Sequence, residues 1–545
     1  MISIIFDSRD FFSNIGMEHF IQRSGLPVKI NNRSGFGITI FYDIAEGTKD
    51  EQPTIRMMEN TIQNKICGRV SGFSRMIPVC QVSHNTGYGD EVIASFKDGN
   101  FQYPCITRNN GNYSIGIDIF RETGYLISGH LDTMRDSIDQ SLKNEIATLP
   151  AVDFLEDMLL AIIRLACNAR NLPLVQKSYW PDGKSFAVCL THDVDELTKT
   201  YQWLSRPLRF FIHGDFTRFN GQVRSLMQKL KGHEPYYTYD DIINIEKSLG
   251  VKSTYFILKE TGNVSLRLKK TWYLYGRNRS FQSPEMVALI HRLLANGDEI
   301  GVHGSYFSYK DPELFNRETR ELEQVTGERL TGNRQHNLNM DIPRTWEYHV
   351  RAGLTYDTSL GFKDTIGFRW GTAFPFHPNN GKETLPLLEI PLTIMDVCLD
   401  SCQEKERECL HLADVVESCH GVLTLLWHPP IFNRLEYPGL RDIYIRINQY
   451  CLEKGAWIGR AKDISEWSDD RIRNTIISDY NPSTKTIIII PKPITSNHYL
   501  TIYLPDNATC EIRSENAQIV KNDGNCVHIK THNLEKDERI VVGIA

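Results

Sequence analysis

The chain has 545 residues, of which 41% are hydrophobic and 23% are charged, and its formal net charge is −6. At about 150 residues per domain, this length predicts three to four domains with enough material for large buried cores. The slightly negative balance excludes a global basic field, so the composition gives no argument for a nucleic acid or an anionic membrane as partner.

The first residues, MISIIFDSRDFF, form an apolar run of only about four residues followed by charged side chains, which is not typical of a secretory signal. No uninterrupted apolar stretch reaches the about 18 residues of a membrane-spanning helix. Twelve cysteines without a signal peptide favour reduced thiols and a cytoplasmic location. The densest cysteine group, Cys398, Cys402 and Cys409, matches no common zinc-binding spacing.

Residues 1–180 mix short alternating apolar runs with turn-rich segments and close with a helical pattern at 153–169. This texture predicts an N-terminal α/β module, to which the sequence assigns no role. The segment 171–183 contains two prolines and a turn dipeptide, and we interpret it as a linker.

Residues 181–472 alternate apolar strands with amphipathic helices. The clearest unit is the stretch TYDDIINIEKSLGVKSTYFIL at 238–258, in which a helix ends at Gly250 and a strand follows. The stretch at 284–302 repeats this plan, and further strand-like runs lie at 387–392 and 422–427. Repeated strand–helix units predict a parallel (β/α) barrel with its active groups at the carboxyl ends of the strands.

Residues 473–545 change pattern again. Short apolar runs about 10 residues apart are separated by Asn, Asp and Pro, which predicts a small antiparallel β-sandwich. The runs lie at 486–490, 499–504, 510–512, 525–530 and 539–543.

Polar side chains that a core would reject follow four apolar runs of the barrel region. Each one alone is explained as a helix cap or an ordinary histidine, but four in one repeat domain favour a single shared site. The four stretches are Thr191-His-Asp-Val-Asp195, His303-Gly-Ser-Tyr-Phe-Ser308, Arg334-Gln-His336 and Trp427-His428-Pro-Pro430.

One aspartate and two histidines suit a divalent cation, most typically zinc, that keeps an open position for water. Such an ion makes its bound water a nucleophile near neutral pH, while a carboxylate takes a proton and another histidine protonates the leaving group. Because alternate residues of a strand point to the same face, Asp193 and Asp195 can reach one site, one as base and the other as ligand.

With these stretches, the region from about 184 to 460 resembles the polysaccharide deacetylase family (chitooligosaccharide deacetylase homology, carbohydrate esterase family four). The resemblance implies an irregular (β/α) barrel of the polysaccharide deacetylase type and a divalent metal, most typically zinc. It also implies a hydrolase that removes N- or O-acetyl groups from a sugar or polysaccharide precursor, with a metal-bound water as nucleophile.

The family's motifs then assign roles to individual residues. The T-x-D-x-D motif makes Asp193 the general base and Asp195 a metal ligand, and the G-x-H motif makes His303 a second ligand. Arg334 matches the arginine that orients the base, and the L-x-H-P motif makes His428 the acid that also stabilises the developing oxyanion.

The second motif departs from the family. A further metal-binding histidine usually follows four residues after the first, and this chain has Phe307 there. In the third motif, the family usually has a proline after the arginine, and this chain has His336 near Arg334 instead. We predict that His336 replaces the missing ligand. Alternatives are His192, although its side chain should point away from the two aspartates, and, through water, Ser305, Tyr306 and Ser308.

Two classes of function therefore stay open, both with an acetylated carbohydrate as partner and neither with a nucleic acid or a membrane span. The two aspartates, Arg334 and His428 favour a metal-dependent deacetylase, whereas the altered second motif favours a barrel that only binds glycans in surface-polysaccharide biosynthesis. A glycoside hydrolase would need a second carboxyl group across the sugar, for which Glu389 and Asp396 are candidates. Asp396 is also the candidate for the aspartate that tunes the acid histidine.

Overall fold

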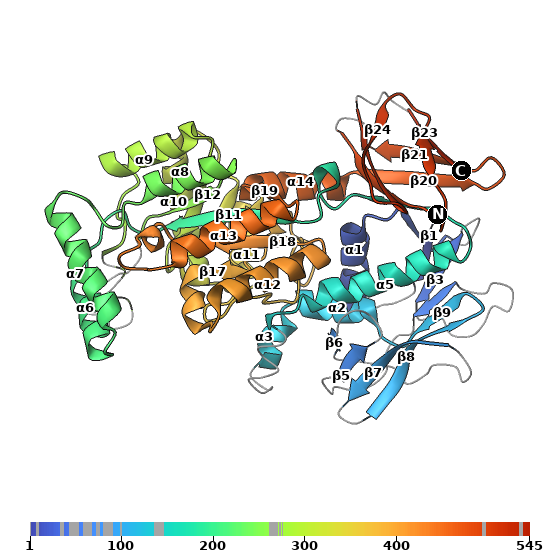
Figure 1. The fold of residues 1–545 in the computed structure, drawn as a ribbon, viewed down its shortest axis with the longest axis horizontal. Helices are drawn as coiled ribbons and strands as arrows, with labels where there is room; N and C mark the ends of the chain where they lie inside the picture. The colour runs from blue at the N-terminus through green and yellow to red at the C-terminus, as the bar shows by residue number, and fades with distance from the viewer. Residues whose placement is uncertain are drawn as a thin grey trace. The chain divides into compact units, whose positions relative to one another are not determined.

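A computed structural model describes residues 2–6, 10–32, 37–42, 54–57, 68–71, 77–79, 91–98, 101–135, 147–260, 271, 274, 276–492, 497–532 and 538–545. The chain divides into two compact units (Figure 1). The unit that we call the barrel unit comprises Phe186–Arg369 and Ala373–Glu466. The other unit comprises Met1–Ser185, Trp370–Thr372 and Trp467–Ala545.

A parallel sheet with the strand order β16-β15-β14-β13-β12-β11-β18-β17 forms the centre of the barrel unit, and β19 pairs with β11. The end strands β16 and β17 are not paired with each other among the described residues, so the sheet is an open, curled barrel. The predicted parallel barrel-like sheet is confirmed. Its strands are β11 (Ala187–Val194), β12 (Thr254–Leu258), β13 (Glu299–Gly304), β14 (Gly332–Gln335), β15 (Tyr356–Asp357), β16 (Leu388–Glu389), β17 (Ile394–Met395), β18 (Val422–Leu426) and β19 (Trp457–Gly459).

Helices connect most successive strands of this sheet, whereas within the described residues 356–395 the strands β15, β16 and β17 follow one another without a helix between them (Figure 1). The predicted helix before Gly250 is confirmed, and Gly250 ends it in the left-handed conformation with φ 71°, which a residue without a Cβ adopts at little cost. The helices are α6 (Gln202–Ile212), α7 (Phe216–Leu230), α8 (Tyr239–Leu249), α9 (Pro284–Ala295), α10 (Pro312–Thr326), α11 (Arg344–Arg351), α12 (Lys405–Ser418), α13 (Leu440–Glu453) and α14 (Ala461–Arg473).

The N-terminal part of the other unit has a mixed sheet with the order β2-β1-β3-β4-β9-β8-β7-β5-β6. Gly16 of α1 and Gly124 of α2 let the two helices touch, because a Cβ at either position would meet the backbone of the other helix. The elements are β1 (Ile2–Phe6), α1 (Phe11–Ser24), β2 (Val28–Ile30), β3 (Ile38–Tyr42), β4 (Ile55–Met57), β5 (Gly68–Ser71), β6 (Ile77–Val79), β7 (Glu91–Asp98), β8 (Phe101–Asn109), β9 (Asn112–Ile115), α2 (Ile119–Ile127), α3 (His130–Arg135) and α5 (Ala151–Asn168).

Two antiparallel sheets share one apolar core in the same unit, which confirms the predicted C-terminal β-sandwich. The interpretation of 171–183 as a linker is wrong for its centre, because β10 pairs with β22 of the sandwich. One sheet has β10 (Leu174–Lys177), β22 (Tyr499–Tyr503), β25 (Cys526–Thr531) and β24 (Ala517–Asn522). The other has β20 (Thr475–Asn481), β21 (Thr486–Lys492), β26 (Ile540–Ile544) and β23 (Cys510–Ile512).

Two predictions from composition concern the cysteines and the membrane. The ten cysteines whose positions are described are all free thiols. In the same part of the chain, no helix combines the length and the apolar character that crossing a bilayer requires.

Candidate active site

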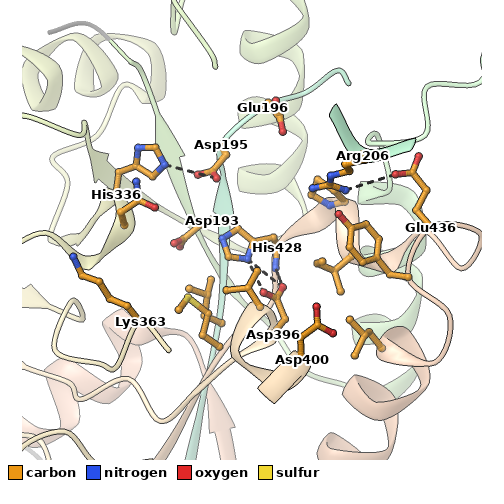
Figure 2. Close-up of a pocket in the computed structure, with 18 of the residues that line it drawn as sticks. Asp193, Asp195, Glu196, Arg206, His336, Lys363, Asp396, Asp400, His428 and Glu436 are labelled. Carbon is orange, nitrogen blue, oxygen red and sulfur yellow. Dashed lines mark hydrogen bonds and ion pairs between the residues drawn. The ribbon is translucent and has the colours of Figure 1, made fainter. Parts of the chain in front are cut away.

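A cavity of about 820 Å³ lies at the carboxyl ends of the barrel strands (Figure 2). Five of the six residues predicted for the site line it, namely Asp193, Asp195, His303, His336 and His428. The sixth, Arg334, is completely buried beside them. Motifs that are up to 235 residues apart in the sequence therefore meet in one place, because parallel strands end at the same edge of a sheet.

Asp195, His303 and His336 form a cluster that could hold a metal ion, since one ligand atom from each lies within 4.8 Å of the others. His303 Nε2 lies 3.3 Å from Asp195 Oδ1, and His336 Nε2 lies 3.9 Å from Asp195 Oδ2. These are the three ligands predicted from the sequence. The histidine after β14 thus lies close enough to take the place of the ligand that is missing at Phe307.

The two histidines are held so that their Nε2 atoms face the aspartate. His303 is paired with Arg334 across β13 and β14, and its Nδ1 lies 2.7 Å from the Arg334 carbonyl oxygen. His336 follows β14, and its Nδ1 lies 3.2 Å from Oε2 of the buried Glu260. When Nδ1 donates to these oxygens, Nε2 keeps its lone pair for a metal, which is the usual arrangement of histidine ligands.

Two carboxylate oxygens in the cluster favour a cation. Asp193 Oδ1 and Asp195 Oδ1 are shielded from solvent and have no hydrogen-bond partner in the described structure. A shielded carboxylate oxygen without a partner is costly, and a cation would compensate it. The side chains of Asp193 and Asp195 are only 4% and 12% exposed. The donor set, one carboxylate and two imidazole nitrogens, fits zinc or a similar ion.

Arg277 is a neighbour of the cluster that the motifs did not indicate. Its Nη1 lies 2.9 Å from Asp195 Oδ2 and 3.2 Å from Glu196 Oε1. Burial raises the pKa of Asp195, but the Arg277 guanidinium, together with His336 and His303, holds that pKa well below its ordinary value. The carboxylate is therefore ionised, as a ligand must be. Arg277 also places a competing positive charge on one of its two oxygens.

Asp193 lies next to the cluster without taking part in a close hydrogen bond of its own. Its Oδ2 is 3.5 Å from His303 Nε2, and its Oδ1 is 3.9 Å from Arg334 Nη1. Arg334 is fixed by hydrogen bonds from Nη2 to Thr191 Oγ1 (2.9 Å) and Thr358 Oγ1 (3.2 Å). A positive charge held by two hydrogen bonds therefore faces the Asp193 carboxylate.

His428 and Asp396 form an acid–carboxylate pair on the other side of Asp193 (Figure 2). His428 Nδ1 lies 2.9 Å from Asp396 Oδ1, and its backbone N–H also donates to Asp396. Burial lowers the pKa of His428, but the Asp396 carboxylate, together with those of Asp195 and Asp193, outweighs this effect and raises that pKa to about 9. The imidazole is thus protonated at neutral pH and can act as an acid.

Of the alternative ligands, His192 and Ser308 make other contacts, whereas Tyr306 lines the cavity. His192 points into the core, where Nδ1 is 2.6 Å from the Trp427 carbonyl oxygen and Nε2 is 2.9 Å from Glu246 Oε1. Ser308 donates to the Ser305 carbonyl oxygen. Glu389 is completely buried, accepts hydrogen bonds from Trp346 Nε1 and the Leu360 backbone, and does not line the cavity.

Comparison with known proteins gives similar structures but no similar sequence. No protein-family model matches the chain, and no curated protein matches it. The solved structures to which it is similar are polysaccharide deacetylases and members of carbohydrate esterase family 4. This is the family that the sequence motifs resemble.

Three of these structures show how distant the similarity is. A protein from Mycobacterium smegmatis, assigned as a polysaccharide deacetylase, is 17% identical over 54% of this chain and 94% of its own, with a TM-score of 0.37. One from Pseudomonas aeruginosa, assigned likewise, is 16% identical over 54% and 94%, with a TM-score of 0.36. A family 4 pseudoenzyme from Bacillus anthracis is 12% identical over 51% and 65%, with a TM-score of 0.26.

Proposed function

We propose that the barrel unit is a metal-dependent hydrolase that removes N- or O-linked acetyl groups from a sugar or a polysaccharide precursor. The main support is the convergence of Asp195, His303 and His336 within 4.8 Å, next to a carboxylate and a protonated histidine. A ligand cluster, a base and an acid that line one cavity are the three parts that metal-assisted hydrolysis requires.

Each residue has a role that follows from its surroundings. Asp195, His303 and His336 hold the metal, most typically zinc, which when bound makes water acidic enough to attack near neutral pH. Asp193 accepts the proton of the attacking water, and the neighbouring Arg334 charge orients the carboxylate. His428, protonated beside Asp396, stabilises the developing negative charge and donates a proton to the leaving nitrogen or oxygen.

A catalytically altered barrel that binds glycans is the second candidate. Two observations favour it: Phe307 stands where the family has a ligand, and Arg277 lies 2.9 Å from the aspartate that would bind the metal. An arginine in this place could substitute for the cation. In that case the cavity would hold an acetylated sugar without hydrolysing it.

Acetate release separates the two candidates. The full chain, supplied with Zn²⁺, would be incubated with N-acetylated and O-acetylated oligosaccharides, and free acetate would be measured. We expect wild type to release acetate, Asp193→Asn to be slower by about 10²–10⁴-fold, and His291→Gln on the exposed face of α9 to be unchanged. Binding of the oligosaccharides without acetate release at any metal concentration would contradict the hydrolase and favour the binding barrel.

A further inference from the structure

The helices α6 and α7, here called the α6–α7 hairpin, expose apolar side chains to an unusual degree. They lie side by side in the barrel unit (Figure 1). The most exposed apolar side chains on the hairpin, each at least 59% accessible, are Leu204, Leu208, Phe211, Ile212, Phe216, Met227 and Leu230.

The apolar residues form one face of each helix. On α6, Leu204, Leu208 and Phe211 are spaced at i, i+4 and i+7, and on α7 the spacing of Phe216, Met227 and Leu230 is equally helical. An ordinary surface helix buries such a face and exposes its polar one. The hairpin does the opposite, so its outer surface is built for an apolar environment that this chain does not supply in the structure described.

The fully buried residues of the hairpin are polar or glycine, and the one on α6 is Gln202. On α7 the buried residues are Gly221, Gln222 and Ser225, opposite the apolar face. The Cβ-free Gly221 packs against the backbone of Leu435. Ser225 donates a hydrogen bond to Glu436 Oε1, and this carboxylate also makes a buried ion pair with Lys199 at 2.7 Å. Polar contacts therefore fix the hairpin to the barrel with its apolar side outward.

The two apolar faces join into one patch. The ring of Phe211 on α6 lies 6.4 Å from that of Phe216 and 5.8 Å from that of Phe219, both on α7. Contiguous apolar patches that extend over two helices mark interaction sites on soluble proteins.

The charge of the hairpin identifies the kind of partner. Residues 202–231 contain six basic side chains and a single carboxylate, Asp215, which gives a formal charge of +5 in a chain whose net charge is −6. Arg209, Arg224 and Lys231 are exposed beside the apolar residues. Helices with Leu and Phe on one face and Lys and Arg around it bind the surface of anionic bilayers.

We propose that the α6–α7 hairpin docks on the surface of an anionic membrane, with its apolar face in the boundary between headgroups and acyl chains. The exposed Arg209, Arg224 and Lys231 would then lie at the level of the phosphates, where each contributes to attraction. The inner side of the hairpin lines the cavity through Arg206, Phe210, Arg218 and Gln222. Docking therefore brings one wall of the cavity against the lipid headgroups.

Vesicle sedimentation tests the proposal independently of any catalytic activity. The full chain would be mixed with vesicles of phosphatidylcholine alone and with vesicles of equal parts phosphatidylcholine and phosphatidylglycerol. We expect sedimentation only with the anionic vesicles, and a decrease as salt is added. Leu208→Glu combined with Phe211→Glu should abolish binding. Arg224→Gln should weaken it about fivefold, since each basic residue contributes about that factor at an anionic surface.

Two controls keep the outcome unambiguous. Leu452→Glu replaces a 38% exposed leucine of α13, outside the hairpin, and should bind vesicles like wild type. Circular dichroism of each variant would show that the fold is kept. The proposal is overturned if the wild type binds neutral and anionic vesicles equally, or if the hairpin variants still sediment with anionic vesicles. It is also overturned if the wild type binds no vesicles but forms a dimer, measured by sedimentation equilibrium, that the hairpin variants abolish.

Discussion

Oε2 of the completely buried Glu260 lies 3.2 Å from Nδ1 of His336, the histidine that we propose as the replacement for the ligand missing at Phe307. A carboxylate behind a histidine ligand fixes the ring and its tautomer and increases its affinity for metal. The proposed replacement ligand therefore has a carboxylate partner that follows β12, which is separated from β14 by β13.

Glu260→Gln should weaken metal binding by about 10–100-fold without removing a ligand, because the amide cannot polarise the imidazole as a carboxylate does. Competition with a chromophoric chelator would measure the affinity. Glu285→Gln, at an exposed position in α9, should have no effect. Unchanged affinity in Glu260→Gln would mean that His336 is not a ligand.

Asp396 should set the alkaline limit of activity. Because the pKa of His428 is raised to about 9, the protonated acid is present below that pH and is lost as the pH rises through it. In Asp396→Asn the pKa should fall to the ordinary value of about 6.5 or lower, so activity would be lost at a correspondingly lower pH. The pH profile of kcat/KM measures the pH at which activity falls on the alkaline side. If Asp396→Asn lost activity at the same alkaline pH as wild type, His428 would be excluded as the acid.

Arg277 should oppose metal binding. The Arg277 guanidinium forms an ion pair with Asp195 Oδ2 at 2.9 Å. Arg277→Met therefore removes a positive charge next to the proposed metal site. We expect the affinity for Zn²⁺ to rise by about tenfold. Arg292→Met, on the exposed side of α9, serves as the matched control. Weaker binding in Arg277→Met would instead show that the arginine positions the aspartate.

The Lys199–Glu436 ion pair should be important for stability. Both side chains are completely buried and 2.7 Å apart, so Lys199→Met leaves a carboxylate without its closest cation. The expected cost is about 3–5 kcal/mol in the free energy of unfolding. Lys229→Met removes a surface pair with Glu234 and should cost at most about 1 kcal/mol. Urea denaturation measures the free energy of unfolding of Lys199→Met and Lys229→Met. Equal denaturation midpoints for the two variants would contradict the importance of the buried ion pair for stability.

The sequence predicts the barrel and the convergence of its strand ends because both depend on local patterns. His303 follows an apolar run, and the parallel register places it beside Arg334. Arg277 could not be assigned in this way, because its role depends on which segment packs behind the strand ends. Glu260 lies two residues after β12, so the rule of polar groups after apolar runs would have been the signal for it.

Other features needed the structure. The pattern of α6 and α7 is amphipathic, but only burial shows that their apolar faces point outward. The sequence did not predict strand β10, because the segment contains two prolines and the pairing partner β22 is more than 300 residues away. The division of the chain at 180 and 472 and the cytoplasmic location stay predictions.

Metal content tests the central claim most directly. Wild type, His303→Ala, His336→Ala and the exposed control His291→Ala would be loaded with Zn²⁺, dialysed and measured by elemental mass spectrometry. We predict about one ion per chain in wild type and in the control, and loss of the ion in both ligand variants. A wild-type chain that retains no metal after loading would contradict the account, and the cavity would then be that of a glycan-binding barrel.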